Sequence, residues 1–105
     1  MPNESIPPGN LDSSGFKLSV VMPVYNEQAT LRAVVERVLA LPLQMELICV
    51  DDGSRDGSVA ILKALAGHHA QLRLIEQPRN MGKGAALRRG FAVLLASLNE
   101  YLSRQ

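Results

Sequence analysis

The sequence is poor in aromatic residues and in cysteine: its 105 residues include two Phe, two Tyr, no Trp and one Cys. So few aromatic side chains argue against a surface on which single-stranded nucleic acid would stack its bases. The lone cysteine, Cys49, cannot form a disulfide within the chain, and its place in an apolar run predicts a buried thiol. A reducing compartment fits this pattern, and we expect a cytoplasmic protein.

A strong charge of either sign and a long apolar run are also missing. The formal net charge is +1, which gives no general attraction to nucleic acid or to anionic lipid. No apolar run approaches the roughly 20 residues of a membrane-spanning helix, and the start of the chain lacks the pattern of a signal peptide. We therefore expect one domain, or part of one, with no nucleic-acid partner and no transmembrane segment.

Strand-like and helical patterns alternate along the chain and predict the order β-α-β-α-β-α. The predicted strands are Leu18–Val24, Met45–Val50 and Leu72–Glu76, each followed by apolar residues at helical spacing. Such alternation indicates an α/β fold with a parallel sheet, a partial Rossmann-like three-layer sandwich in which the second strand is central. Residues 1–17, rich in Pro, Gly and small polar side chains, are predicted to form a flexible tail.

Start and stop signals place the three predicted helices. Asn26 is the expected N-cap of the first helix, and Pro42 stops this helix near Leu41. Asp56 or Ser58 is expected to cap the second helix, which Gly67 ends. The third helix is expected from residue 85 onward. The residues expected on the buried faces are Leu31, Val34, Val35, Val38 and Leu39, then Val59, Ile61, Leu62, Leu65 and Ala66, then Phe91, Leu94, Leu95, Leu98 and Leu102.

The stretch from residue 47 to residue 58 is the one most suggestive of a site. Its apolar strand ends in Asp51 and Asp52, followed by glycines and small polar residues. In open α/β sheets, ligands bind outside the carboxyl ends of the strands. Two adjacent carboxylates repel each other, so an ordinary surface turn gains nothing from the pair. The alternative, that one carboxylate caps the following loop or helix and the other is solvated, stays open.

A second glycine-rich segment, Gly82-Lys83-Gly84, follows the third predicted strand. Glycines let the backbone approach an anion, and the next helix offers its positive N-terminal end. The dinucleotide-binding fingerprint fails because Leu87 stands where its third glycine belongs, and the P-loop pattern fails because Ala85 follows Gly84. A phosphate contact and a plain helix-entry turn with a solvated lysine both remain open.

Three segments taken together resemble one known family. They are Val20–Glu27 (VVMPVYNE), Val50–Ser58 (VDDGSRDGS) and Arg79–Phe91 (RNMGKGAALRRGF). In this order and spacing they resemble the N-terminal part of the family 2 inverting glycosyltransferases. The closest similarity is to the branch that loads sugars onto polyprenyl phosphates, such as dolichyl-phosphate mannosyltransferases. The resemblance extends over most of the chain, from about residue 18 to residue 91.

The resemblance implies a GT-A fold and a nucleotide-sugar donor. Carried over to this sequence, it implies that Asp52, with Asp51 beside it, accepts hydrogen bonds from the base or the ribose. An ionised carboxylate accepts but does not donate, which suits the ring N–H of uracil or guanine. Lys83 would reach the diphosphate as a point charge. The residues implied to line the base and ribose pocket are Pro23, Tyr25 and Glu27.

The sequence departs from the family in one respect. The family places an Asp-x-Asp motif on the next strand, where it holds Mg²⁺ or Mn²⁺ across the donor diphosphate, and no Asp follows Asp56 here. We therefore expect no catalytic residue and no metal ligand in this chain, although a complete family member uses Mg²⁺ or Mn²⁺. Residues 18–105 are expected to form the donor-binding half of such an enzyme, with the C-terminal half absent.

Other interpretations of function stay open. The chain could be a nucleotide-binding module without catalysis, or a truncated and inactive fragment. A polyprenyl-phosphate acceptor is implied by the resemblance, and with it a peripheral position at the membrane. The sugar, the base and the acceptor are not determined by the residues.

Overall fold

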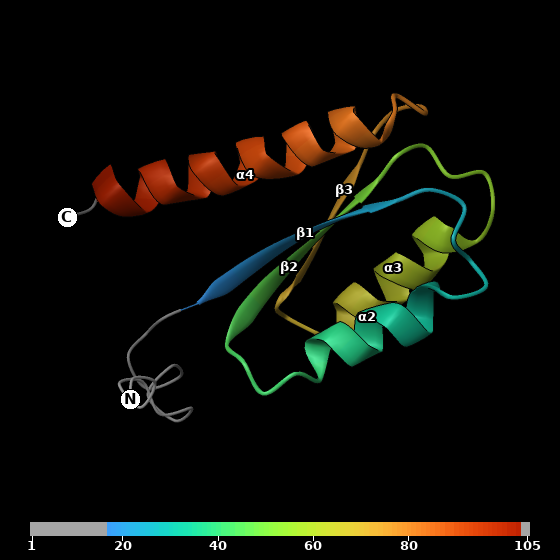
Figure 1. Cartoon of the computed structure of the whole chain (residues 1–105), viewed down its shortest axis with the longest axis horizontal. Helices are drawn as coiled ribbons and strands as arrows, with labels where there is room; N and C mark the ends of the chain where they lie inside the picture. Colours follow the sequence, from blue (N-terminus) through green and yellow to red (C-terminus); the bar gives the residue numbers. More distant parts are fainter. Residues whose placement is uncertain (1–16, 104–105) are drawn as a thin grey trace, which may run out of the picture.

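A computed structural model describes residues 17–103, which form a three-stranded parallel sheet with helices on both faces (Figure 1). The strands run in the order β1-β2-β3, so β2 is central. The elements are β1 (Leu18–Val24), α2 (Leu31–Leu39), β2 (Met45–Asp51), α3 (Ser58–His68), β3 (Leu72–Glu76) and α4 (Lys83–Ser103). The predicted α/β order, parallel pairing and central second strand are confirmed, and β2 is one residue longer than predicted. The predicted tail lies outside the described residues except for Lys17.

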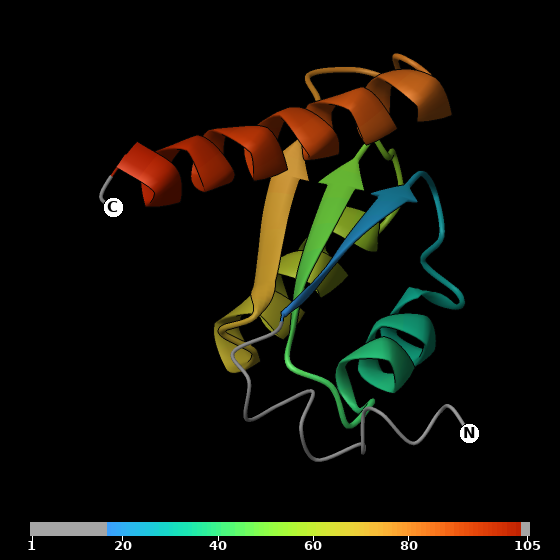
Figure 2. The ribbon, with the colours of Figure 1, turned by 60° about the vertical axis from the view of Figure 1, so that its left-hand side comes forward.

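The central strand divides the core into two layers because its side chains alternate between the faces of the sheet. Leu47 and Cys49 belong to a cluster with the apolar sides of α2 and α3. Ile48 and Val50 belong to a second cluster with Ala86 of α4. Figure 2 shows α4 crossing one face of the sheet, with α2 and α3 on the other. Strand β2 is therefore covered on both faces, which is the environment in which a continuous apolar strand is stable.

The register of the strands brings their carboxyl ends into line. Val24 at the end of β1 pairs with Asp51, and Asp51 pairs with Glu76 at the end of β3. The loops that follow the three strands consequently leave the sheet at the same edge.

Helix α2 begins later than predicted. Its first residue is Leu31, and the flanking residue is Thr30 rather than Asn26. Asn26 has a left-handed backbone with φ of 50°, and its side chain bonds to another loop instead of capping the helix. The helix ends at Leu39, two residues before the predicted end. Val34, expected in the core, is 44% exposed.

Helix α3 begins at Ser58, but neither Asp56 nor Ser58 is its N-cap, and the helix ends one residue later than predicted. Gly57 flanks its start and offers no side chain for capping. The Asp56 carboxylate accepts the N–H of Ser58 instead, at 2.9 Å. At the other end the helix continues through Gly67 to His68. Leu62 and Leu65 are buried, as the apolar spacing predicted.

Helix α4 turns a different face to the sheet from the one predicted. Its buried residues are the small ones, Ala86 and Gly90, and Leu94 is the only member of the predicted face that packs against the core. The other four, Phe91, Leu95, Leu98 and Leu102, are each more than half exposed. The prediction was wrong because the side of the helix without bulky side chains can approach the sheet most closely.

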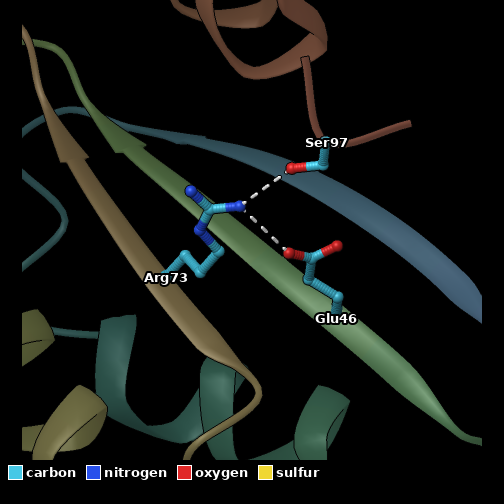
Figure 3. Close-up of polar contacts among 3 residues, drawn as sticks. All are labelled: Glu46, Arg73 and Ser97. Carbon is cyan, nitrogen blue, oxygen red and sulfur yellow. Dashed lines mark hydrogen bonds and ion pairs between the residues drawn. The ribbon is translucent and has the colours of Figure 1, made fainter. Parts of the chain in front are cut away.

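A polar contact ties the second half of α4 to the sheet. Nη1 of Arg73 donates to Oε2 of Glu46 and to Oγ of Ser97, each at 3.4 Å (Figure 3). These residues come from β3, β2 and α4, so the contact joins three elements. Within residues 17–103, no helix has both the length and the apolar content to cross a membrane.

Candidate functional site

The carboxyl edge of the sheet holds a cleft built by three loops. We call residues 25–30 the first loop, residues 52–57 the second loop and residues 77–82 the Gly-rich loop; each follows one strand. The cleft has a volume of about 260 Å³. Its lining residues are Pro23, Val24, Tyr25, Glu27, Asp52, Asn80, Gly82 and Lys83. A cleft at this edge is where the topology of a parallel sheet favours a ligand.

The structure brings together most of the residues singled out from the sequence. Those that border the cleft are Pro23, Tyr25, Glu27, Asp52 and Lys83. Asp51 does not border it. Sequence reasoning missed two lining residues, Val24 and Asn80, and named Gly82 only as part of the glycine-rich segment. A signal for both existed, because they lie inside the segments that carry the family resemblance.

Asp51 points into the protein rather than into the cleft. It is 1% exposed, and its Oδ2 accepts the N–H of Ser54 at 2.9 Å. Its Oδ1 is buried without a hydrogen-bond partner. A carboxylate that accepts an N–H three residues along the chain stabilises a turn. Asp51 thus shapes the start of the second loop.

Asp52 connects the second loop to both of its neighbours. Its Oδ1 accepts the N–H of Met81 at 2.8 Å, and its Oδ2 accepts the N–H of Gly82 at 2.9 Å. Its own N–H donates to the carbonyl oxygen of Val24, also at 2.8 Å. The residue is only 3% exposed, so these bonds are shielded from water.

Asn26 fastens the first loop to the second. Its backbone N–H donates to Oγ of Ser54, and its Oδ1 accepts the N–H of Arg55, both at 2.8 Å. The left-handed backbone of Asn26 suits this use, because asparagine tolerates positive φ better than most residues. The residue therefore bridges two loops that are 28 to 29 positions apart in sequence.

Two further residues extend the same contact between the loops. The N–H of Gln28 donates to Oδ2 of Asp56 at 3.2 Å, and the N–H of Gly57 donates to Oε1 of Gln28 at 2.8 Å. The N–H of Glu27 donates to Oγ of Ser58 at 2.9 Å. Hydrogen bonds from Ser58 are the main cause that lowers the pKa of Asp56 below its ordinary value. The first loop is thus held by side chains of the second loop and of α3.

The cleft is lined by side chains of both charges, which come from different elements. Glu27 and Asp52 bring carboxylates to the sides formed by the first and second loops. Lys83 lies at the start of α4, whose first turn contains no acidic residue. The first N–H groups of a helix and a lysine both favour an anion. The cleft can therefore accept N–H and O–H donors at one end and phosphate oxygens at the other.

A divalent metal does not fit the carboxylates of this edge. Asp52 uses both oxygens on backbone N–H groups, and Asp51 uses one in the same way. Among residues 17–103 there is no group of three or more His, Cys, Asp or Glu that could hold a metal ion. We therefore assign no metal ligand here.

Comparison with known proteins gives a consistent result. Residues 19–95 match the sequence model of the family described as "Glycosyl transferase family 2". A dolichyl-phosphate beta-glucosyltransferase of Trichomonas vaginalis is 35% identical over 99 residues, covering 85% of this chain and 29% of that protein. A dodecaprenyl-phosphate galacturonate synthase of Rhizobium johnstonii is 39% identical over 80 residues. This match covers 71% of this chain and 24% of that protein.

A solved structure is also similar. It is a mannosyltransferase from Pyrobaculum calidifontis in complex with GDP-Man and Mn²⁺, with a TM-score of 0.64 and 26% identity. The match covers 69% of this chain and 22% of that one. The chain thus spans less than a third of the length of each of these relatives.

Proposed function

The chain belongs to glycosyl transferase family 2, and from this premise we propose that its cleft binds the nucleotide part of a nucleotide-sugar donor. The observation that carries the proposal is the convergence of three loops on one cleft at the carboxyl edge of the sheet. These loops hold the segments on which the family resemblance rests. The fold is the α/β arrangement of the GT-A glycosyltransferases, and the similar mannosyltransferase structure contains a nucleotide sugar.

The base and ribose are assigned to the side of the cleft formed by the first loop. Pro23 and Tyr25 offer apolar surface there, and Tyr25 is 41% exposed, so its ring is available to a ligand. Glu27 adds a carboxylate that can accept ribose hydroxyls. Asp52 lies beside them, but both of its carboxylate oxygens already accept backbone N–H groups of the Gly-rich loop.

The diphosphate is assigned to the opposite side, where α4 begins. Lys83 contributes a positive charge, and Gly82 exposes backbone without a side chain in the way. Ala86 donates its N–H to the carbonyl of Gly82 at 3.1 Å, so the first turn of the helix is formed next to the cleft. Together they would hold phosphate oxygens without requiring the ligand to order the loop.

In this proposal the contribution of residues 18–105 to sugar transfer is donor binding, as one part of a longer domain. The second-loop carboxylates are engaged in holding loops, so we propose that they neither carry the metal nor act as the base. The Mn²⁺ of the similar mannosyltransferase supports the use of a divalent metal in the family. The names of the relatives in turn support a polyprenyl-phosphate acceptor. With it we propose a cytoplasmic protein at the membrane surface.

The test is calorimetric titration of the full chain with UDP, GDP, UDP-glucose and GDP-mannose. We expect one base to bind, and Lys83→Ala to weaken diphosphate binding by about tenfold, the scale of one charge-assisted contact. Lys63→Ala is the matched control, because Lys63 pairs with Glu76 at 3.7 Å and lies outside the cleft. The proposal would be overturned if neither UDP nor GDP, nor their sugars, bound to the chain. It would also be overturned if Lys83→Ala bound the diphosphate with the same affinity as the wild type.

A further inference from the structure

We propose that Asp52 is a positioning residue: its carboxylate holds the Gly-rich loop in the conformation that places Lys83 at the cleft. The ligand in this inference is the one of the proposed function, but the contacts between Asp52 and the loop do not depend on it. Both carboxylate oxygens accept backbone N–H groups of that loop, from Met81 and Gly82. The partners lie 29 and 30 residues away in sequence, so the bonds determine where the loop lies.

Gly53 provides a second, independent contact to the same loop. Its φ is +77°, and a Cβ atom placed there would lie 2.5 Å from the carbonyl carbon of Arg79 and from the nitrogen of Asn80. The loop backbone therefore packs directly on the glycine. Residues 79 and 80 are held by this close approach, and residues 81 and 82 by the carboxylate of Asp52.

Gly82 links Asp52 to Lys83. Gly82 donates its N–H to Asp52, and its carbonyl accepts the N–H of Ala86 in the first turn of α4. Gly82 is thereby fixed from both sides, and Lys83 is the next residue. Hydrogen bonds to an ionised acceptor are roughly twice as strong as those between neutral groups. Because Asp52 is only 3% exposed, water competes little for its bonds to Met81 and Gly82.

The variant to test is Asp52→Asn in the full chain, with Asp56→Asn as the matched control. The amide keeps the size of the side chain, but its NH₂ group faces one of the two backbone N–H groups. Asp56 also accepts two backbone N–H groups, from Gln28 and Ser58, but on the other side of the second loop. The two variants therefore remove equivalent charges with different partners.

Amide hydrogen exchange measured by NMR needs no ligand. We expect the amides of Met81 and Gly82 to exchange at least about tenfold faster in Asp52→Asn and at the wild-type rate in Asp56→Asn. Unchanged protection of both amides in Asp52→Asn would refute the proposal. If Asp52→Asn does not fold, the test uses the wild-type chain alone. The amides of Met81 and Gly82 should then exchange more slowly than the amides of exposed residues around them. If these two amides exchange as fast as their exposed neighbours, the proposal is refuted.

Ligand binding separates positioning from direct contact with the base. We expect Asp52→Asn to weaken binding of the diphosphate found to bind by about tenfold and to leave binding of its nucleoside unchanged. In the Asp52→Asn background, Lys83→Ala should add no further loss. An equal loss for nucleoside and diphosphate, or fully additive losses, would show direct contact and overturn the inference. If no nucleotide binds at all, the proposed function fails. The amide hydrogen exchange of Met81 and Gly82 still tests whether Asp52 holds the loop.

Discussion

The backbone of Gly90 in α4 lies directly against the side chain of Val21 in β1, with no room for a Cβ atom between them. This contact sets the distance and the rotation of α4 on the sheet. Ala86, one turn earlier, faces the same way and is fully buried. The helix therefore packs mainly through its small residues, with Leu94 beside them. Its other large apolar side chains, Phe91, Leu95, Leu98 and Leu102, are each more than half exposed.

Substitution Gly90→Ala should lower the free energy of unfolding by about 1–3 kcal/mol, the usual range for overpacking a core. Val21 is β-branched and cannot rotate freely out of the way. The measurement is urea unfolding followed by circular dichroism. Val21→Ala in the same chain should recover part of the loss that Gly90→Ala causes. Purely additive losses in the double variant would contradict this account of the contact.

Gly53→Ala should destabilise the protein more than Gly82→Ala does. Both glycines have positive φ, +77° and +98°, so both substitutions add backbone strain of about 1–2 kcal/mol. Only at Gly53 would the new Cβ also collide with backbone atoms, since nothing lies within 4 Å at Gly82. The comparison is made by urea unfolding of both variants, and equal losses would count against the close approach.

Cys49 should be unreactive toward thiol reagents in the folded protein. The side chain is fully buried, and burial raises its pKa to about 12, so almost no thiolate exists at neutral pH. We expect labelling by iodoacetamide to be slow without denaturant and fast in urea. Rapid labelling of the native chain would refute the burial of this residue.

The same raised pKa predicts a loss of stability in alkaline solution. Below the ordinary thiol pKa of 9.0, both states hold the proton and pH has no effect through this group. Above it the unfolded chain releases the proton first, so stability falls as the pH rises from about 9 toward 12. Unfolding free energies of the wild type and Cys49→Ala should converge over this range. A constant difference would argue against the shift.

Asp56 should contribute to stability at neutral pH and lose that contribution in acid. Its pKa is lowered in the folded state, so its stabilising effect is present above the ordinary value of 3.8 and disappears as the pH falls through the folded-state value. We expect the wild type to be more stable than Asp56→Asn at pH 6 and equally stable once the carboxyl is protonated. A difference that does not vary with pH would point to a role other than charge.

The sequence by itself determined the sheet and the edge on which the site lies. Short apolar, β-branched runs ended by turn residues predicted the three strands to within one residue. Their alternation with helices indicates a parallel sheet with long crossovers. Once the strands are parallel, their carboxyl ends share one edge, so residues after different strands had to meet there. The family resemblance placed Tyr25, Asp52 and Lys83 in one cleft, and this shared edge is the physical reason that they meet.

Tertiary structure decided the contacts between residues far apart in the chain. Apolar spacing could not tell which side of α4 faces the sheet, because that depends on Gly90 meeting Val21 some 70 positions earlier. Nor could capping preferences show that Asn26 bonds to Ser54 instead of its own helix. The direction of Asp52, toward the Gly-rich loop, follows from the packing of two loops, and local sequence contains no information about the loop that will lie beside it.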